Sequence, residues 1–250
     1  MSLPKRIITT LMIKNGVLYR SKKFKPDYRY TLNFVDMWSI DEVIVLDISR
    51  EISFEDKKKK FFFEQLLEIA KNAYVPITAG GGIRSLKHIE LLLKNGSDKV
   101  IINSAALKNP NFINEAAKEF GSQCIVLSVD VLKDKSQYFV MKNYGKEKSK
   151  YSLLDYIKMI QENNAGEIFI QSINMDGSLN GYDLNIIDFI NDYIKIPLII
   201  SSGAGNWSHV KDALKKDAVS AASLTNIFHF TEKSINNLKN FIKDEIYIRN

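Results

Sequence analysis

The stretch that decides the fold is written twice: residues 75–90, VPITAGGGIRSLKHIE, recur as residues 196–211, IPLIISSGAGNWSHVK. Three identical pairs, each 121 residues apart, mark the match: Pro76 and Pro197, Gly82 and Gly203, and His88 and His209. Two more stretches repeat, because RIITTLMIKNG (6–16) falls on CIVLSVDVLKD (124–134) and EVIVLDIS (42–49) falls on EIFIQSIN (167–174). A repeat of half the chain predicts one body made of two equal halves, approximately residues 1–121 and 122–250.

The chain alternates two kinds of segment along its length. Short apolar runs rich in β-branched residues are followed by amphipathic runs of helical period, which is the pattern of strand–helix units around a parallel sheet. We expect eight strands: Arg6–Ile13, Glu42–Ile48, Pro76–Ala79, Lys99–Ile102, Cys124–Val131, Glu167–Ile173, Leu198–Ser201 and Val219–Ser223. Helices are expected after most of them, for example over Ser85–Asn95, Asn111–Phe120, Leu153–Asn163, Asn185–Tyr193, Ser208–Lys216 and Glu232–Glu245.

Eight such units in 250 residues predict one α/β domain over residues 1–250. Its expected architecture is a closed (β/α)8 TIM barrel built from two half-barrel repeats. Residues Gln137–Tyr151 are expected to form a hairpin inserted after the fifth strand, with GKEKSK (145–150) as its turn.

Composition narrows the partners and the compartment. The net charge of +6 (35 basic minus 29 acidic residues) suits an anionic ligand, but the basic residues are spread among acids, so we expect no nucleic acid to bind. Cys124 is the only cysteine and cannot form an internal disulfide, which favours a reduced, cytoplasmic protein. The apolar run Ile7–Ile13 is too short for a signal or a membrane span, so no membrane partner is expected. The basic run Lys57–Lys60 is expected to begin a helix and to face solvent.

The repeat aligns a methionine with an acid at the expected site of chemistry. In a barrel of this kind the active site lies at the C-terminal ends of the strands. Side chains alternate in and out along a strand, so Met12 and Asp130 should face each other across the barrel mouth. A carboxylate there can take or give a proton, whereas a thioether can do neither. We therefore expect Asp130 to be catalytic in one half, with no counterpart in the other.

Glycine-rich turns follow the third and seventh expected strands, at Gly80–Gly82 and at Ser201–Gly205. Such turns let backbone N–H groups approach an anion, and the helix that follows adds its positive N-terminal end. Two of them on one face predict a ligand with a phosphate at each end, and no metal or cofactor is expected. The residues expected at these phosphate sites are Gly81, Gly82, Asn103, Ser104, Gly203, Gly205, Thr225 and Asn226.

Four charged residues open strands at the opposite end of the expected barrel: Arg6, Glu42, Lys99 and Glu167. By the same alternation they point inward, and two cations beside two anions should pair because an unpaired buried charge is destabilising. Two interpretations stay open. The ring is either a salt-bridge plug in the barrel floor, or a gate over a small-molecule path lined by Thr10, Thr78, Ser128, Gln171 and Ser201.

Several stretches together resemble one known family. They are KRII (5–8), DEVIVLDI (41–48), AGGGI (79–83), DKVIIN (98–103), FGSQ (120–123), GEIFIQSI (166–173), DGSLNGYD (176–183), SGAG (202–205) and FHF (228–230). Over nearly the whole chain they are similar to HisF, the cyclase subunit of imidazole glycerol phosphate synthase. The resemblance implies a barrel that accepts ammonia from a docked HisH-like glutaminase and uses it to split and cyclise a ribulosyl aminoimidazole carboxamide nucleotide.

The resemblance also implies roles for single residues. It implies catalysis for Asp130, support from the sixth loop for Asp176, and a glutaminase contact for Asp98. It implies an ammonia gate formed by Arg6, Glu42, Lys99 and Glu167.

The chain departs from the family pattern where the chemistry should occur. Met12 replaces the first catalytic aspartate, Arg20 stands at the position of the catalytic loop lysine, and the usual Gly-Asp-Pro before the second strand is shortened to Tyr28–Leu32. This combination resembles the HisF-like paralogues of surface-glycan genes. We therefore expect a subunit that conducts ammonia from a HisH-like glutaminase to a separate sugar amidotransferase, in lipopolysaccharide or flagellar glycan biosynthesis, with cyclase activity impaired by Met12.

Two other hypotheses remain. The protein is a cyclase of histidine biosynthesis in which Asp47 or Asp176 substitutes for the missing acid, or it is a non-catalytic barrel that activates its glutaminase. A phosphosugar isomerase of the sister family is disfavoured, because that reaction also depends on an acid at the position of Met12.

Overall fold

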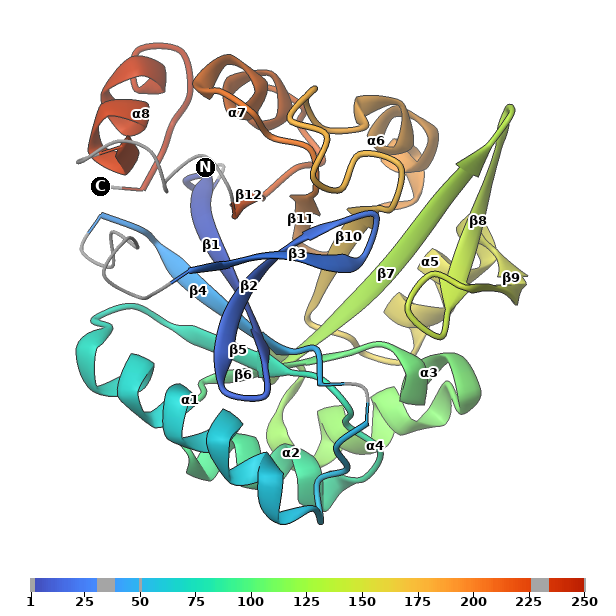
Figure 1. The fold of residues 1–250 in the computed structure, drawn as a ribbon. Coiled ribbons are helices and arrows are strands. Elements are labelled where there is room, and N and C mark those ends of the chain that lie inside the picture. The colour runs from blue at the N-terminus through green and yellow to red at the C-terminus, as the bar shows by residue number, and fades with distance from the viewer. Residues whose placement is uncertain (1–2, 31–38, 50, 226–233, 250) are drawn as a thin grey trace.

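The computed structural model describes residues 3–30, 39–49, 51–225 and 234–249, and its centre is a closed barrel of eight parallel strands (Figure 1). In chain order the strands are β1 (Arg6–Lys14), β4 (Glu42–Asp47), β5 (Ile77–Gly80), β6 (Lys99–Ile102), β7 (Ile125–Asp134), β10 (Glu167–Ser172), β11 (Leu198–Ser201) and β12 (Ala221–Leu224). Each pairs with the next, and β12 pairs with β1 to close the ring. The predicted (β/α)8 barrel is confirmed.

Helices surround the barrel and cover its outer face (Figure 1). They are α1 (Lys60–Asn72), α2 (Leu86–Lys94), α3 (Ser104–Lys108), α4 (Asn111–Phe120), α5 (Leu153–Glu162), α6 (Leu184–Ile190), α7 (Trp207–Leu214) and α8 (Ser234–Ile242). The helices bury an apolar stripe against the strands; in α1 this stripe is Phe62, Leu66 and Ile69. Polar caps fix where several helices begin, because the side chains of Ser85 and Asn206 accept the N–H groups of His88 and His209.

Two β-hairpins extend from the barrel on the side where the strands end. One consists of β2 (Val17–Lys22) and β3 (Lys25–Tyr30) and continues β1, whereas the other consists of β8 (Gln137–Lys142) and β9 (Glu147–Ser152) and continues β7. The second was predicted from the sequence and the first was not. The two hairpins stand at matching places in the two halves.

Strand register supports the alignment of the two halves. Met12 pairs with Leu46 between β1 and β4, and Asp130 pairs with Gln171 between β7 and β10. Ile8 and Val126 likewise lie opposite Glu42 and Glu167, so the first strand of each half carries the same offset. The register thus places Met12 where the other half has Asp130.

A separate apolar layer fills the inside of the barrel. It consists of Ile8, Ile44, Ile101, Val126, Phe169, Ile199 and Ala221, each no more than 4% exposed. Thr78 pairs with Ile44 and lies level with this layer. The layer separates the charged residues at the strand starts from the cavity at the strand ends. Within the described residues, no helix is both long enough and apolar enough to cross a membrane.

Candidate active site

A continuous pocket lies at the C-terminal mouth of the barrel. One part contains the second glycine turn, with Gly203 and Thr225 in its lining, and the other contains the first, with Gly82 and Ser104; residues of both halves line each part. The same residues line the junction of the two parts: Leu46, Ile48, Asp130, Tyr144 and Gln171. Asp130 therefore stands between the two predicted phosphate sites, where the middle of a two-phosphate ligand would lie.

Asp130 is buried and hydrogen-bonded. Its Oδ1 accepts hydrogen bonds from Gln171 Nε2 at 3.2 Å and from Ser128 Oγ at 3.3 Å. Burial raises the pKa of Asp130 to about 6, although hydrogen bonds from Ser128, Gln171 and Asn103 oppose the shift. A carboxyl group with such a pKa can both give and take a proton near neutral pH, as general acid–base catalysis requires.

The raised pKa makes Asp130 a source of instability that can be measured. The folded-state pKa of Asp130 exceeds the unfolded value of about 3.9. The free energy of unfolding therefore falls as the pH rises from about 4 to about 6, and the loss is complete above that range. We expect Asp130→Asn to raise the free energy of unfolding by roughly 1–3 kcal/mol at pH 8 and by little at pH 4. Urea denaturation at both pH values tests this, with exposed Asp134→Asn as the control. An equal gain at both pH values would contradict it.

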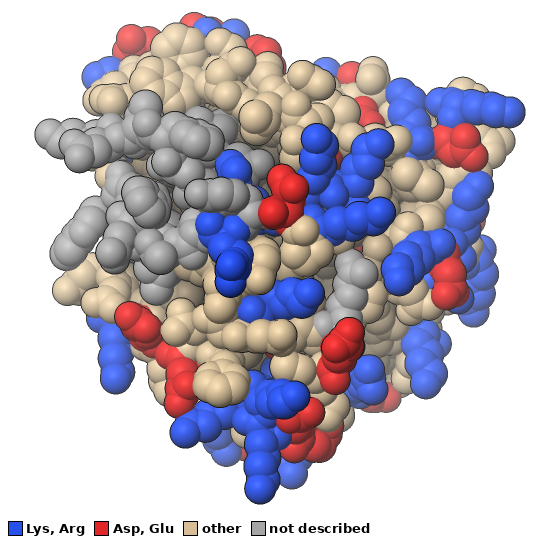
Figure 2. Space-filling view, in the orientation of Figure 1, with Lys and Arg blue, Asp and Glu red and all other residues tan. Residues whose placement is uncertain are grey.

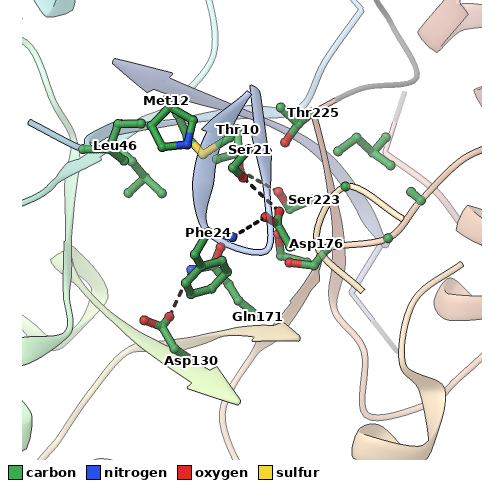
Figure 3. A pocket seen from close by; sticks show the side chains of 18 of the residues that line it. Thr10, Met12, Ser21, Phe24, Leu46, Asp130, Gln171, Asp176, Ser223 and Thr225 are labelled. Atoms are coloured by element: carbon green, nitrogen blue, oxygen red, sulfur yellow. Dashed lines mark hydrogen bonds between the residues drawn. The ribbon is translucent and has the colours of Figure 1, made fainter. Parts of the chain in front are cut away.

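The opposite wall of the pocket is apolar. Figure 3 shows Met12 and Leu46 on one side and Asp130 on the other, with Phe24 between them. No carboxylate lies on the Met12 side of this part of the pocket among the described residues that line it. The wall that would carry a second acid can therefore bury a ligand but cannot move a proton.

Both acids that the sequence offered as substitutes line the pocket and are held by hydrogen-bond donors. Asp47 is buried; its Oδ2 accepts from Lys59 Nζ at 2.6 Å and its Oδ1 accepts from the Ser49 N–H at 2.8 Å. Asp176 accepts from Ser21 Oγ at 2.9 Å through one oxygen and from the Phe24 N–H at 2.8 Å through the other. Burial raises the pKa of Asp176, and these two bonds oppose the shift. Each carboxylate is thus held by donors at both oxygens.

Asp176 also holds the first hairpin over the mouth. Its two bonds end on β2 and on the β2–β3 turn, and its carbonyl accepts the Lys23 N–H at 3.2 Å. Gly177 packs so close to the turn that an added Cβ would lie 2.7 Å from the Ser21 carbonyl oxygen. The hairpin and the β10–α6 loop therefore cover the pocket as one unit. Arg20 lies in β2 within this hairpin, and the predicted shortening at Tyr28–Leu32 falls partly outside the described residues.

The two glycine-rich turns adopt matching conformations. Gly81 and Gly82 have φ values of 109° and 76°, and Ser202 and Gly203 have φ values of 78° and 103°. Backbone N–H groups in turns of this kind can form an anion-binding concavity. Gly203 admits no side chain, because a Cβ would lie 2.1 Å from the Gly181 carbonyl oxygen.

The other predicted phosphate residues divide between several places. Ser104 and Asn103 line the first-half pocket, and the Asn103 amide also hydrogen-bonds to Asp130. Thr225 lines the second-half pocket. Gly205 is not among the residues that line it, and its N–H is donated to His209 Nδ1 at 3.1 Å. Asn226 lies outside the described residues.

The four charged residues at the other end form a closed ring of ion pairs. Arg6 bonds to Glu42 at 2.5 Å and to Glu167, while Lys99 Nζ lies 3.2 Å from Glu42 and 3.3 Å from Glu167. Burial lowers the pKa of Arg6, but the two carboxylates outweigh this and raise it. The ring is neutral in total, and the apolar layer lies directly above it.

Two features of the outer surface bear on partners. On the ring side, Asp98 is exposed, and its Oδ2 accepts the Ile77 N–H at 2.8 Å. On the mouth side, residues 14–30 hold six basic residues and one acid, and residues 133–150 hold six and two. These segments carry a net +9, so the rest of the chain carries −3 of the total +6. Figure 2 shows Lys and Arg gathered over the middle of this face and along the β8–β9 hairpin.

Sequence reasoning missed two elements of the site. Lys59 was expected in solvent, but it is 3% exposed, because it pairs with Asp47 and lies over the Phe54 ring at 4.2 Å. The β2–β3 hairpin was not expected either. Asn15-Gly16, the two-residue turn that joins β1 to β2, is a strong signal for antiparallel pairing of those two strands, and the repeat placed this segment opposite the hairpin that was predicted.

Comparison with known proteins identifies the family. The family described as "Histidine biosynthesis protein" matches residues 6–234. Proteins named imidazole glycerol phosphate synthase subunit HisF are 38% identical in Natranaerobius thermophilus, over 97% of this chain and 97% of that one, and 36% identical in Exiguobacterium sp., over 96% and 94%. The HisF of Flavobacterium johnsoniae is 37% identical over 95% of each chain. This similarity spans the barrel, the ring and the mouth pocket alike, and the chain belongs to the HisF family.

Proposed function

We propose that this protein is the ammonia-accepting barrel of a glutaminase–synthase pair, and that it works on a phosphorylated ligand at the barrel mouth with one catalytic carboxylate in place of two. The observation that carries the proposal is the pairing of a neutral, closed charged ring with a mouth pocket in which Asp130 faces Met12. Relatives named as subunits of a synthase support the need for a partner.

A path through the barrel would suit ammonia in its neutral form. Above the ring, the apolar layer offers no partner for a cation, since burying an unpaired charge is strongly unfavourable. Small neutral NH3 has no such penalty. Thr10, Gln171 and Ser201 line the pocket beyond the layer and supply groups that hydrogen-bond to it. In this proposal Lys99 and its partners in the ring open the way from below.

The mouth suits an anionic ligand. The two glycine turns at Gly82 and Gly203 offer backbone N–H groups on either side of Asp130, and the hairpins add a net +9 around the opening. Positive potential of this kind raises the local concentration of phosphorylated ligands. The ligand class that fits best is a small molecule with a phosphate at each end.

Two candidate reactions would use the delivered ammonia. The names of the relatives favour the cyclase reaction of imidazole glycerol phosphate synthase, in the histidine pathway. Met12 and Leu46 favour the other candidate for this chain, delivery of ammonia to a separate amidotransferase that modifies a surface sugar. In both cases Asp130 is the group in the mouth that exchanges protons, and in both a HisH-like glutaminase binds at the ring end.

A direct test of the pair is binding of a HisH-like glutaminase to this protein. Asp98→Asn keeps the acceptor for the Ile77 N–H but removes the charge, so the barrel should fold normally while the complex weakens by about tenfold, the effect of one interfacial charge pair. Asp134→Asn, at the opposite end, is the matched control. Isothermal titration of both variants measures the change. Equal affinity for all three proteins would remove Asp98 from the interface, and no binding by the wild type would contradict the proposed pair.

A further inference from the structure

The two repeated histidines turn back onto the two glycine-rich turns in the same way. In the first half, the Arg84 N–H donates to His88 Nδ1 at 3.2 Å. In the second half, the Gly205 N–H donates to His209 Nδ1 at 3.1 Å. In each case the donor lies four residues before the histidine and two residues after the second positive-φ residue, Gly82 or Gly203. The repeat has kept this contact although the sequences around it differ.

The contact is a variant of a common helix cap. Ser85 and Asn206 are the N-cap residues of α2 and α7, and their side chains accept the N–H groups of His88 and His209 at the third helical position. In the usual capping box, the side chain at that position returns to the N–H of the cap residue. Here the imidazole reaches one residue further back, to the N–H of the residue before the cap.

Each imidazole also contacts the loop that follows the preceding strand. His88 stacks on the Phe54 ring at 4.0 Å between centroids, and its Nε2 lies 3.0 Å from Glu55 Oε1. His209 lies against the β10–α6 loop, where an added Cβ on Gly181 would be 3.5 Å from the ring. At His88, an acceptor at Nδ1 requires the neutral tautomer protonated at Nε2, which points that proton to Glu55. At His209, Nε2 lies 3.2 Å from the Asn206 amide nitrogen. Both rings therefore lie between a glycine turn and its neighbouring loop.

We propose that His88 and His209 are positioning residues that each hold one glycine turn in its phosphate-binding conformation. The inference rests on the proposed phosphate sites and adds the groups that shape them. By accepting the N–H of Arg84 or Gly205, the imidazole removes that donor from the anion site and fixes the short segment between Gly82 or Gly203 and the helix. A turn fixed in this way binds an anion without first having to be ordered.

The repeat supplies an internal control, because each histidine should act on its own turn alone. We would titrate the full chain with inorganic phosphate and follow the amide signals of Gly82 and Gly203 by NMR. His88→Leu should weaken phosphate binding at Gly82 by about threefold to tenfold, the effect of one hydrogen bond, and leave Gly203 within about twofold. His209→Leu should give the reverse. Melting temperatures recorded in parallel separate this local effect from a general loss of stability.

A second pair of variants keeps the acceptor and removes the ring. In His88→Asn and His209→Asn, Oδ1 stands the same number of bonds from Cβ as Nδ1 does, so phosphate affinity at the matching glycine should return to within about twofold of the wild type. Wild-type binding at both glycines with unchanged affinities in the Leu variants would overturn the inference and leave the phosphate sites standing. Weakening of both sites by either Leu variant, or no rescue by Asn, would also overturn it. No saturable binding at either glycine in the wild type would overturn the phosphate sites and the inference together.

Discussion

Supplied with ammonium salt and the ribulosyl nucleotide of the histidine pathway, the isolated protein should turn over at least about 100-fold more slowly than a HisF that carries both aspartates. The expectation follows from the site, because one general acid–base group commonly contributes about 10²–10⁴-fold and the wall at Met12 has none. Asp47 and Asp176 each accept donors at both oxygens, and the proposal assigns neither of them the role of the missing acid. Steady-state product formation measures the rate.

Substitution at Met12 tests the cause. Met12→Asp should recover at least about tenfold of the missing rate, because the opposite acid and the glycine turns remain in place. Met12→Asn is the matched control: it is of similar size and polarity but cannot transfer a proton, and it should recover nothing. Full-rate turnover by the wild type would reject the impaired-cyclase proposal. Equal recovery by Asp and Asn would show that polarity, and not proton transfer, limits the rate.

Removal of one ring member should uncouple glutamine hydrolysis from product formation. Lys99→Leu leaves Glu42 and Glu167 with Arg6 as their remaining partner in the ring, and buried carboxylates that lose a cation rearrange or take up water. In the reconstituted complex, product formed per glutamine hydrolysed should fall by about tenfold, the effect of roughly 1.4 kcal/mol on the route that ammonia takes. The rate driven by added ammonium salt should stay unchanged, because that ammonia enters at the mouth.

A matched substitution separates the ring from a general effect of losing a lysine. Lys60 forms an exposed pair with Glu64, with side chains 77% and 50% exposed. Lys60→Leu should therefore change neither the product formed per glutamine hydrolysed nor the ammonium-driven rate. If Lys99→Leu keeps full coupling, the ring is a structural plug. If Lys99→Leu lowers both the glutamine-driven and the ammonium-driven rates, the substitution has damaged the mouth as well. That result would reject the proposal that the ring acts only on the route of ammonia.

The fold could be predicted because its signals are local and occur twice. The helix Asn111–Phe120 has the predicted bounds, and the strands β6 and β11 do too. The ends of β7 were less predictable: the strand continues to Asp134, three residues beyond the prediction, because it pairs with β8 there. Cys124 falls in a short 3-10 turn before the strand begins.

The first hairpin was not predicted because the residues at its tip are not typical of a turn. Lys23 and Phe24 have φ values of 49° and 60°, which Gly and Asn adopt far more readily than such residues do. The second hairpin was predicted, but its turn was expected at residues 145–150, whereas it lies at residues 143–146 between β8 and β9. Of the residues at positive φ there, Asn143 and Gly145 are types that adopt this conformation readily. The unusual tip is held from outside, because Asp176 accepts the N–H of Phe24. A contact across 152 residues leaves no local signal in the sequence.

The candidate site divides in the same manner. Asp130, Met12 and the ring members could be placed because strand alternation fixes which side chains face inward. The pairing of Asp47 with Lys59 could not, since it depends on the path of the loop between β4 and α1, and a run of four lysines favours solvent for all of them. The structure corrects that expectation for Lys59.

The apolar layer would make protons leave at one end of the barrel and be taken up at the other. If ammonia crosses it uncharged, every molecule that leaves glutamine as ammonium must release one proton on the ring side before it passes Ile8 and Phe169. The neutral ammonia then arrives in the mouth as a base, beside the Asp130 carboxyl group, whose pKa of about 6 lets it hold or yield a proton. Each turnover would leave a proton at one end of the molecule and claim one at the other, so the glutaminase and the mouth would respond in opposite directions to a change in pH.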